Sequence, residues 1–228
     1  QGIKRVTGVV ENVDIEKNLD LMLALQPELD KILVINEQSI TGDAIRKEID
    51  AVESKYRSRV EIEHINSMDM EEIASKTAEL GKNSAILWVL LFKDKTGRFF
   101  TYKDNLQQIR KITNTPIYGL WDFYLDYGIV GGFLTSATSQ AEAACKIVDQ
   151  IFAGKDPSHI PIVEKSPNRY MFDYKELENH RIDPSPVLKN YEIINKPFSF
   201  YEEYKQYVWL FAAIFSAIIM IVLFLMQN

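Results

Sequence analysis

The chain has 228 residues, of which 46% are hydrophobic and 25% charged, and its formal net charge is −6. These proportions are ordinary for a folded protein, and the length outside one long apolar segment suits a single globular domain. The acidic balance gives no electrostatic support for a nucleic-acid partner. The single cysteine, Cys145, excludes an internal disulfide. Because it falls in an apolar helical pattern, we expect a buried thiol.

Helical and strand-like patterns alternate along the first 120 residues. Asp14 is placed to cap a helix, and a further helix is expected to end at Gly81. The apolar face of the first helix would carry Ile15, Leu19, Met22 and Leu23. The other helices are expected near residues 45–56, 69–80 and 104–112.

Short apolar strands are expected at residues 31–36, 59–65, 85–92 and 116–120. The strand at 59–65 alternates, as an exposed strand does, whereas 85–92 suits a central strand. Repeated strand–helix units of this kind predict an α/β fold, a mainly parallel sheet with helices on both faces.

The pattern changes after the last of these strands. A helix is expected at residues 139–152, ended by Gly154. Its inward face would carry Ala141, Ala144, Val148 and Ile151. After Pro157, prolines interrupt a stretch without long periodicity, so we expect irregular chain running over the domain surface.

Residues 209–226 contain no charged side chain. Eighteen helical residues span about 27 Å, close to the ~30 Å core of a bilayer. A buried helix of a soluble domain would usually keep a polar stripe, so residues 208–226 are predicted to be a transmembrane helix. Tyr204, Tyr207 and Trp209 precede or begin it. They suit either an aromatic belt at the membrane interface, in a connector at 191–207, or an amphipathic helix that packs on the domain.

Parallel sheets bind ligands beyond the carboxyl ends of their strands, which points to the loops at residues 37–42, 92–97 and 121–132. The last loop brings Trp121, Asp122 and Tyr124 directly after a strand and then becomes rich in glycine. That mixture suits a small-molecule pocket, although a tightly packed turn would use glycines in the same way.

Ser39, Thr41 and Gly42 lie where a strand leads into a helix. Hydroxyls and amides at a helix start favour a carboxylate or a phosphate, and N-capping by Ser39 or Thr41 is the alternative. Lys93 and Lys95 are expected to be solvated turn residues.

Signals for catalysis are weak. The three histidines form no metal-binding spacing with cysteine, and no HExxH, GxSxG or Walker motif occurs. His64 is therefore expected to be a structural or exposed strand residue. We expect no catalytic residue, no metal site and no cofactor in this chain.

Three runs of sequence resemble a known family. The run TGVVENVDIEKNLDLMLALQPELDKILVINEQSITG resembles the second lobe of type I periplasmic binding proteins, in the ABC-transporter substrate-binding-like family. The run YGLWDFYLDYGIVGGFLTSATSQAEAACKIVDQIFAGKDPSHIPIV is similar to that family's return segment. SPNRYMFDYKELENHRIDPSPVL, followed by INKPFSFYEEYKQYVW, resembles the form found as the extracytoplasmic sensor of bacterial membrane histidine kinases and diguanylate cyclases.

The resemblance implies a ligand-binding domain over residues 1–190, with two lobes joined by crossing strands. Residues 14–120 would form the second lobe and 129–153 would return to the first. Most of the first lobe would precede Gln1, and an effector domain would follow Asn228. By position, the residues facing the ligand would be Thr7, Gly8, Ser39, Thr41, Trp121, Asp122 and Tyr124.

The leading hypothesis is a small-molecule sensing region of a receptor in the bacterial inner membrane, not itself an enzyme and expected to form a homodimer. An amino acid, a small carboxylate or an aromatic metabolite would suit the candidate residues. A membrane-anchored substrate-binding protein of an ABC transporter is one alternative. A tail-anchored cytosolic α/β protein, which could be an enzyme, is the other. The charges beside the apolar segment are too few to decide its orientation.

Overall fold

The computed structural model describes residues 6–227. The chain divides into two compact units, Gln1–Asn195 and Lys196–Asn228. The first unit is built on one seven-stranded sheet with the order β2-β1-β3-β4-β5-β6-β7. The strands are β1 Lys31–Ile35, β2 Glu61–Ile65, β3 Ser84–Trp88, β4 Ile117–Gly119, β5 Gly131–Leu134, β6 Arg169–Asp173 and β7 Glu192–Ile194. Strands β1 to β5 are parallel, β6 is antiparallel to β5, and β7 is parallel to β6. The predicted mainly parallel α/β fold is confirmed.

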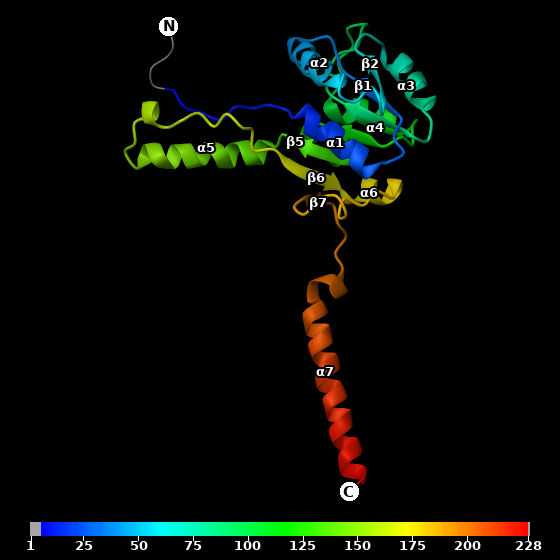
Figure 1. Cartoon of the computed structure of the whole chain (residues 1–228), viewed down its shortest axis with the longest axis vertical. Coiled ribbons are helices and arrows are strands. Elements are labelled where there is room, and N and C mark those ends of the chain that lie inside the picture. The colour runs from blue at the N-terminus through cyan, green and yellow to red at the C-terminus, as the bar shows by residue number, and fades with distance from the viewer. Residues whose placement is uncertain (1–5, 228) are drawn as a thin grey trace. The chain divides into compact units, whose positions relative to one another are not determined.

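Helices cover both faces of this sheet (Figure 1). The helices of the first unit are α1 Ile15–Leu25, α2 Ile40–Glu53, α3 Met70–Ala78, α4 Tyr102–Arg110, α5 Ala137–Phe152 and α6 Tyr174–His180. Alternate side chains of β3 enter two separate cores. Ala85 and Leu87 pack with α1 and α2 on one face, and Ile86 and Trp88 pack with α3 and α4 on the other. This double burial explains why the predicted central strand has no polar residue inside it.

Local signals place most helix starts correctly. Asp14 caps α1 by accepting a hydrogen bond from the Lys17 amide at 3.0 Å. The four apolar residues predicted for the inner face of α1 are buried. Asp69 caps α3 in a reciprocal pair with Glu72. β2 lies at the sheet edge, so its partial exposure agrees with the alternating sequence.

Several predicted boundaries are wrong; the strand expected at 85–92, for example, ends at Trp88. Ser39 caps α2, so the helix begins at Ile40, inside the stretch 37–42 that was expected to be a loop. Helix α3 ends at Ala78 with Glu79 as its cap, before Gly81. The reason is that residues 81–84 form the turn into β3, in which the Ser84 amide donates to the Gly81 carbonyl at 3.2 Å.

The connection from β4 to β5 is unusually short for parallel strands. It contains only the 3₁₀ helix η1, Asp122–Tyr124. Tyr124, Leu125 and Ile129 take the place of a crossover helix, because they are buried in the same core as α4. At its end, Gly131 has φ +143°, and a Cβ there would lie 2.1 Å from the Met171 carbonyl oxygen.

The expectation of irregular chain after Pro157 is wrong. The stretch contains β6, α6 and β7, which extend the sheet beyond β5. These elements span five, seven and three residues, too short for a clear periodicity between the prolines. The two strands form because β5 offers a free edge to β6, and β6 offers one to β7.

Helix α5 extends away from the sheet, beside the segments at residues 6–13 and 154–168 (Figure 1). These two segments pair with each other: the Val163 amide donates to the Gly8 carbonyl at 2.9 Å, and Val10 donates to Val163 at the same distance. The four residues predicted for the inner face of α5 are all exposed, so that prediction is wrong; the buried hydrophobic residue of this helix is Ile147, which was not on the predicted face. Cys145 is exposed, so the expectation of a buried thiol is wrong. Within the described chain, no other helix covers the apolar face of α5.

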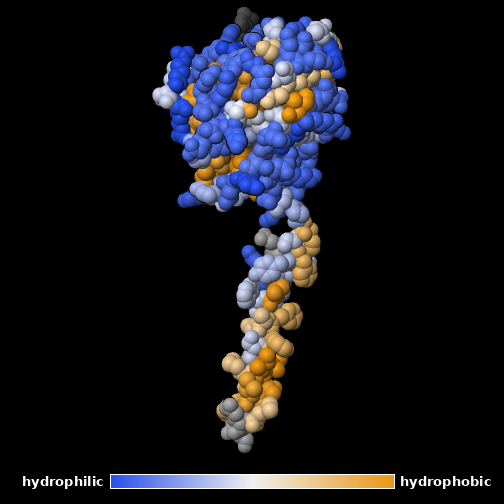
Figure 2. Space-filling view, turned by 90° about the vertical axis from the view of Figure 1, so that its right-hand side faces the viewer, coloured by the Kyte–Doolittle hydropathy of each residue, from blue (hydrophilic) through white to orange (hydrophobic). Residues whose placement is uncertain are grey.

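The second unit is one helix, α7 Phe200–Gln227, of 28 residues. Its segment Glu203–Met226 is long and apolar enough to cross a membrane, and none of its most apolar part is buried. The apolar colouring strengthens along this helix toward its carboxyl end (Figure 2). Near its start, the Trp209 indole donates to the Tyr201 hydroxyl at 3.2 Å, and the Phe200 and Tyr204 rings lie 4.8 Å apart.

Candidate functional site

The carboxyl ends of the five parallel strands lie at one edge of the sheet. β1 has β2 on one side and β3 on the other, so the chain changes direction across the sheet between β1 and β3. Open α/β sheets bind ligands outside the carboxyl ends of the strands at such a switch point. This rule places the candidate site over the loops that follow β1 and β3.

A polar pocket of about 290 Å³ lies at this switch point. Its lining comes from three loops, those after β1, β2 and β3. The lining residues are Asn36, Glu37, Gln38, Asn66, Ser67, Met68, Leu91, Lys93, Asp94, Lys95, Thr96 and Gly97. The structure therefore brings together the loops predicted at 37–42 and 92–97. It adds the loop at 66–68, which the sequence reading missed although the same carboxyl-end rule applies to β2.

Glu37 joins the two predicted loops. Its Oε2 accepts hydrogen bonds from the amides of Phe92 at 2.5 Å and Lys93 at 3.1 Å. Asn36 is buried and fixes the loop from below: its Oδ1 accepts from the Glu37 amide at 2.9 Å, and its Nδ2 donates to the Gly42 carbonyl at 2.8 Å. The pocket wall is thus held by side chain-to-backbone bonds before any ligand arrives.

Asp94 organises the turn on the other side of the pocket. Its Oδ1 accepts from the amides of Thr96 and Arg98, and from the Thr96 hydroxyl at 2.7 Å. Burial alone would raise the pKa of Asp94, but these hydrogen bonds outweigh burial and lower the pKa below its usual value. Lys95 pairs with Glu72 and lies 3.4 Å from the Asp69 carboxylate. Lys95 is nevertheless exposed and lies in the turn, as predicted.

The predicted residues at the start of α2 have defined structural contacts. Ser39 Oγ accepts from the Gly42 amide at 3.1 Å, as the capping alternative requires. Gly42 is buried, and a Cβ there would lie 2.2 Å from the Glu37 carbonyl oxygen. The amides of Ile40 and Thr41 form no hydrogen bond with another described residue. Both residues are exposed, so these two amides at a helix start are accessible to an anionic group.

Trp121 and Asp122 lie farther along the same edge, at the end of β4. The Trp121 indole donates to Glu11 Oε1 at 3.1 Å, and the Asp122 amide donates to the Thr135 carbonyl at 3.0 Å. Both side chains are half-buried. Tyr124 is fully buried, edge-on to Trp88 at 6.4 Å between ring centroids, and burial raises the pKa of its phenol. Tyr124 therefore supports this part of the edge from behind rather than forming its surface.

Thr7 and Gly8 lie in a separate place, on the segment that runs beside residues 161–163. Thr7 Oγ1 donates to the Pro161 carbonyl at 3.3 Å, and the Gly8 carbonyl accepts from Val163. Three segments meet the sheet at its carboxyl-end edge: residues 6–13 before α1, the exit from β5, and residues 164–168 before β6. The predicted site residues are thus distributed over the switch point, the end of β4 and a crossing segment.

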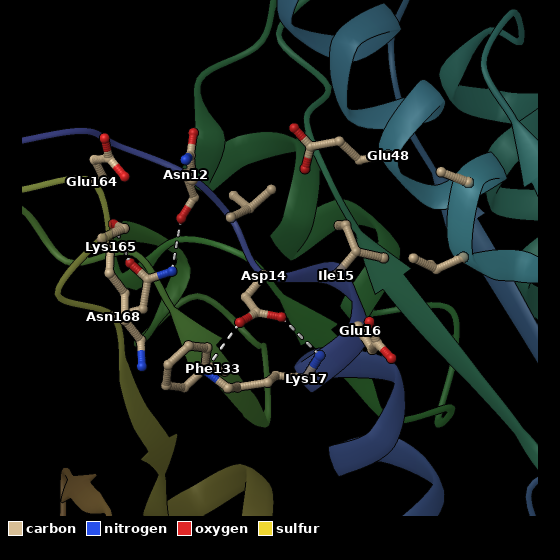
Figure 3. A pocket seen from close by; sticks show the side chains of 14 residues that line it. Asn12, Asp14, Ile15, Glu16, Lys17, Glu48, Phe133, Glu164, Lys165 and Asn168 are labelled. Carbon is tan, nitrogen blue, oxygen red and sulfur yellow. Dashed lines mark hydrogen bonds and ion pairs between the residues drawn. The ribbon is translucent and has the colours of Figure 1, made fainter. Parts of the chain in front are cut away.

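A larger hollow of about 470 Å³ lies where these crossing segments meet α1 and α2 (Figure 3). Asn168 donates to the Asn12 carbonyl at 2.8 Å across it. Lys17 pairs with Asp14 at 3.0 Å and lies 4.2 Å from the centroid of the Phe133 ring. The smaller pocket, at the switch point, is the candidate ligand site. The hollow lies beside α1 and α2 rather than at the switch point.

One cluster has metal-ligand chemistry. Ligand atoms of Asp50, Glu53 and His64 lie within 4.8 Å of one another. Arg46 pairs with Asp50 at 2.7 Å, Arg57 lies 3.7 Å from Glu53, and His64 Nε2 lies 3.2 Å from Glu53 Oε2. Two guanidinium groups therefore balance the two carboxylates already. The cluster is an ion-pair network, in agreement with the structural role expected for His64.

Comparisons with known proteins support the fold. A ligand-free, open substrate-binding protein with adhesive properties from Clostridium difficile superposes with TM-score 0.63 at 13% identity, over 84% of this chain and 63% of that one. The ABC domain of a Streptococcus pneumoniae protein in complex with L-Trp gives 0.60 at 19% identity, over 85% and 68%. A conserved domain protein from Vibrio cholerae gives 0.58 at 15%, over 82% and 62%.

This chain therefore spans less than two thirds of the length of the Clostridium and Vibrio structures. A search of curated proteins finds no match. The family model described as ABC transporter substrate binding protein matches residues 1–190. With the doubly wound sheet and its polar switch-point pocket, this match shows that the chain belongs to the ABC transporter substrate binding protein family.

Proposed function

We propose that this chain is the extracytoplasmic, small-molecule-binding region of a bacterial membrane receptor. In this proposal, ligand closes two lobes, and the movement passes to a membrane-spanning α7. The observation that carries it is the combination, in one chain of this family, of a polar pocket at the switch point and a helix apolar enough to span a bilayer. The ligand need only bind the closed state more tightly than the open one. The role requires no catalytic step from this chain.

The chemistry of the edge favours a ligand with a carboxylate and an apolar or aromatic part. The amides of Ile40 and Thr41 offer two donors at the positive end of the α2 dipole. The ring of Trp121 stacks on Phe123 at 6.1 Å and leaves both rings partly accessible. The similar Streptococcus protein was solved with L-Trp, which has both features. An amino acid, a small carboxylate or an aromatic metabolite fits this set.

The other half of the site would come from a first lobe outside this sequence. The apolar face of α5 supports this, because Val148, Ile151 and Phe152 are 43%, 36% and 86% exposed. An apolar row of this kind is normally covered in a soluble protein. In the family resemblance, α5 returns to the first lobe, so the same lobe would cover α5 and face the switch-point pocket.

The short connector favours a receptor over a delivery protein. Five residues, 195–199, separate the end of β7 from the start of α7. Five residues reach at most about 17 Å, which suits transmission of movement better than a long flexible tether would. The alternative, a membrane-anchored substrate-binding protein of an ABC transporter, is supported by the family description. The coding sequence after Asn228 separates the two, because a kinase or cyclase domain would indicate a receptor.

A receptor of this kind would also be expected to be a homodimer, which light scattering in detergent measures.

Calorimetry on the full-length protein tests ligand binding, with L-tryptophan, other amino acids and succinate as probes. We expect Trp121→Ala and Asp122→Ala to weaken binding of the active probe by roughly tenfold or more, the loss of one or two good contacts. Ile112→Ala is the control, since Ile112 is 50% exposed and precedes β4, at the amino ends of the parallel strands. Absence of heat from all probes, with receptor output unchanged in both variants, would contradict the proposal. A topology reporter that places the first unit in the cytoplasm would favour the tail-anchored alternative.

A further inference from the structure

The segment at residues 121–128 runs from the carboxyl ends of the parallel strands to their amino ends. Trp121 and Asp122 lie at the carboxyl end of β4, next to the candidate ligand edge. Gly128 lies at the opposite edge, where the chain is about to enter β5 and a Cβ would lie 3.0 Å from Arg110 Cγ. Because only the short 3₁₀ helix η1 intervenes, eight residues connect the two ends of the strands directly.

Aromatic packing makes this crossing segment stiff. The centroids of Trp121 and Phe123 lie 6.1 Å apart, and those of Phe123 and Tyr124 lie 4.6 Å apart. Tyr102 of α4 contacts the segment at both ends, with its ring 5.4 Å from Phe123 and 5.7 Å from Tyr127. Packed rings of this kind move together rather than independently.

The far end of the segment binds the residue that follows β7. The Asn195 side-chain amide donates to the Asp126 carboxylate and, at 2.8 Å, to Asp173 Oδ2. Asp173 is 3% exposed, caps α6 by accepting from the Lys175 amide at 2.8 Å, and accepts from the Asp126 amide at 3.3 Å. One asparagine therefore joins the crossing segment, the end of β6 and the start of the connector to α7.

Two members of this cluster hold strained backbone. Asp126 has φ +72° and Asn195 has φ +58°. Asparagine and aspartate adopt this left-handed region more readily than other non-glycine residues, but still at a cost. The shared hydrogen bonds keep both residues there. Breaking the bonds therefore releases the backbone at the start of the connector as well as at the crossing segment.

We propose that the Asp126–Asn195–Asp173 cluster is a latch that couples the ligand edge to the membrane connector through residues 121–128. This proposal depends on the proposed function in one respect only, that ligand binding is the event that displaces Trp121. A displacement of Trp121 is passed along the stiff segment to Asp126, and the latch transfers it to Asn195. By reciprocity, loosening Asn195 also loosens the segment at Trp121.

Hydrogen exchange, read by mass spectrometry on the chain in lipid nanodiscs without ligand, tests this latch. We expect Asn195→Ala to raise exchange roughly fivefold or more at both 195–199 and 121–128, the lower end of typical coupling between sites. Trp121→Ala should raise exchange at 195–199 by a similar factor. This second effect should disappear when Asn195 is already alanine.

The controls keep folding and coupling apart. Asn179→Ala removes an exposed amide contact to Glu176 in α6 and should leave both peptides unchanged. Phe99→Ala removes an aromatic ring outside the crossing segment. Peptides from β1 to β3 should keep their protection in every variant, and Asp126→Asn provides a nearly isosteric second route if Asn195→Ala does not fold.

A Trp121→Ala effect confined to residues 119–135 would overturn the latch, as would full additivity in the double variant. No ligand is used, so a failure here is distinguishable from a failure to find a ligand. Conversely, a chain that binds none of the calorimetric probes can still show the latch.

Discussion

Asn18 and Phe133 bind each other as two neighbouring strands would. Asn18 Nδ2 donates to the Phe133 carbonyl at 3.1 Å, and Asn18 Oδ1 accepts from the Phe133 amide at 2.8 Å. Asn18 is fully buried in α1, and Phe133 lies in β5. A side-chain amide thus replaces the backbone partner that part of β5 lacks, and it joins α1 to the strand from which the chain leaves the sheet.

Asn18→Ala should lower the free energy of unfolding by about 2–4 kcal/mol, because it leaves a buried amide and a buried carbonyl without partners. Urea denaturation followed by tryptophan fluorescence, with the chain in detergent, measures this loss. Asn179→Ala is the control, since Asn179 is exposed and its contact lies on the surface. A loss below that of the control would show that Asn18 is dispensable.

Gly42 and Gly8 are both predicted site residues, and the same substitution at each can be compared. Gly42→Ala should destabilise by about 2–3 kcal/mol, because the new methyl group collides with the Glu37 carbonyl and displaces the pocket loop. Gly8→Ala meets nothing within 4 Å and should change stability by less than about 0.5 kcal/mol. Thermal unfolding of the two variants side by side checks the difference. Equal effects would contradict the close packing seen at α2.

Two substitutions at Ser39 distinguish its role as a helix cap from direct contact with a ligand. Ser39→Ala should cost about 1 kcal/mol through loss of the bond from the Gly42 amide, and Ser39→Asp should restore that stability because aspartate caps equally well. A direct contact between the serine hydroxyl and an anionic ligand would make Ser39→Asp weaken binding while stability is kept. Unchanged affinity in both variants would leave Ser39 with capping alone.

His64 should make the protein less stable in mild acid. Burial lowers its pKa below 6.5, and Arg46 adds to this, whereas Glu53 and Asp50 oppose it. Because the folded pKa lies below the unfolded one, this contribution is present above pH 6.5 and is lost as pH falls toward the folded value. Unfolding measured between pH 7.5 and about 5.5 should show a smaller acid-dependent loss in His64→Gln than in the parent. A parent-like profile in His64→Gln would contradict this assignment.

If α7 spans a membrane, charged residues at its centre should prevent its insertion. Replacing Ile218 and Ile221 with arginine should add about 6–8 kcal/mol to the cost of insertion. The double variant should move from the membrane pellet to the supernatant on alkaline carbonate extraction. Replacing the same two residues with leucine should leave the chain in the pellet. Extraction of the parent chain would refute a membrane span.

Local chemistry explains where sequence reading succeeded. Caps such as Asp14 and Asp69, and the uninterrupted apolar run of β3, carry their signal within a few residues. β6 and β7 were missed because their pairing depends on the free edge of β5, which no local pattern reveals. At the candidate site, the loops were foreseen from the carboxyl-end rule, but the burial of Tyr124 behind that edge was not.

The sequence by itself determined the order of helices and strands from α1 to β4, the helix α5, the family and the apolar helix, because each depends on periodicity, capping or motifs among neighbouring residues. Only the tertiary structure decided which groups meet: Glu37 with the amides after β3, Asn18 with Phe133, and Asn195 with Asp126. It also decided that α5 is exposed. Contacts between residues far apart in the chain leave no local signature, because they arise from how the sheet orders its strands.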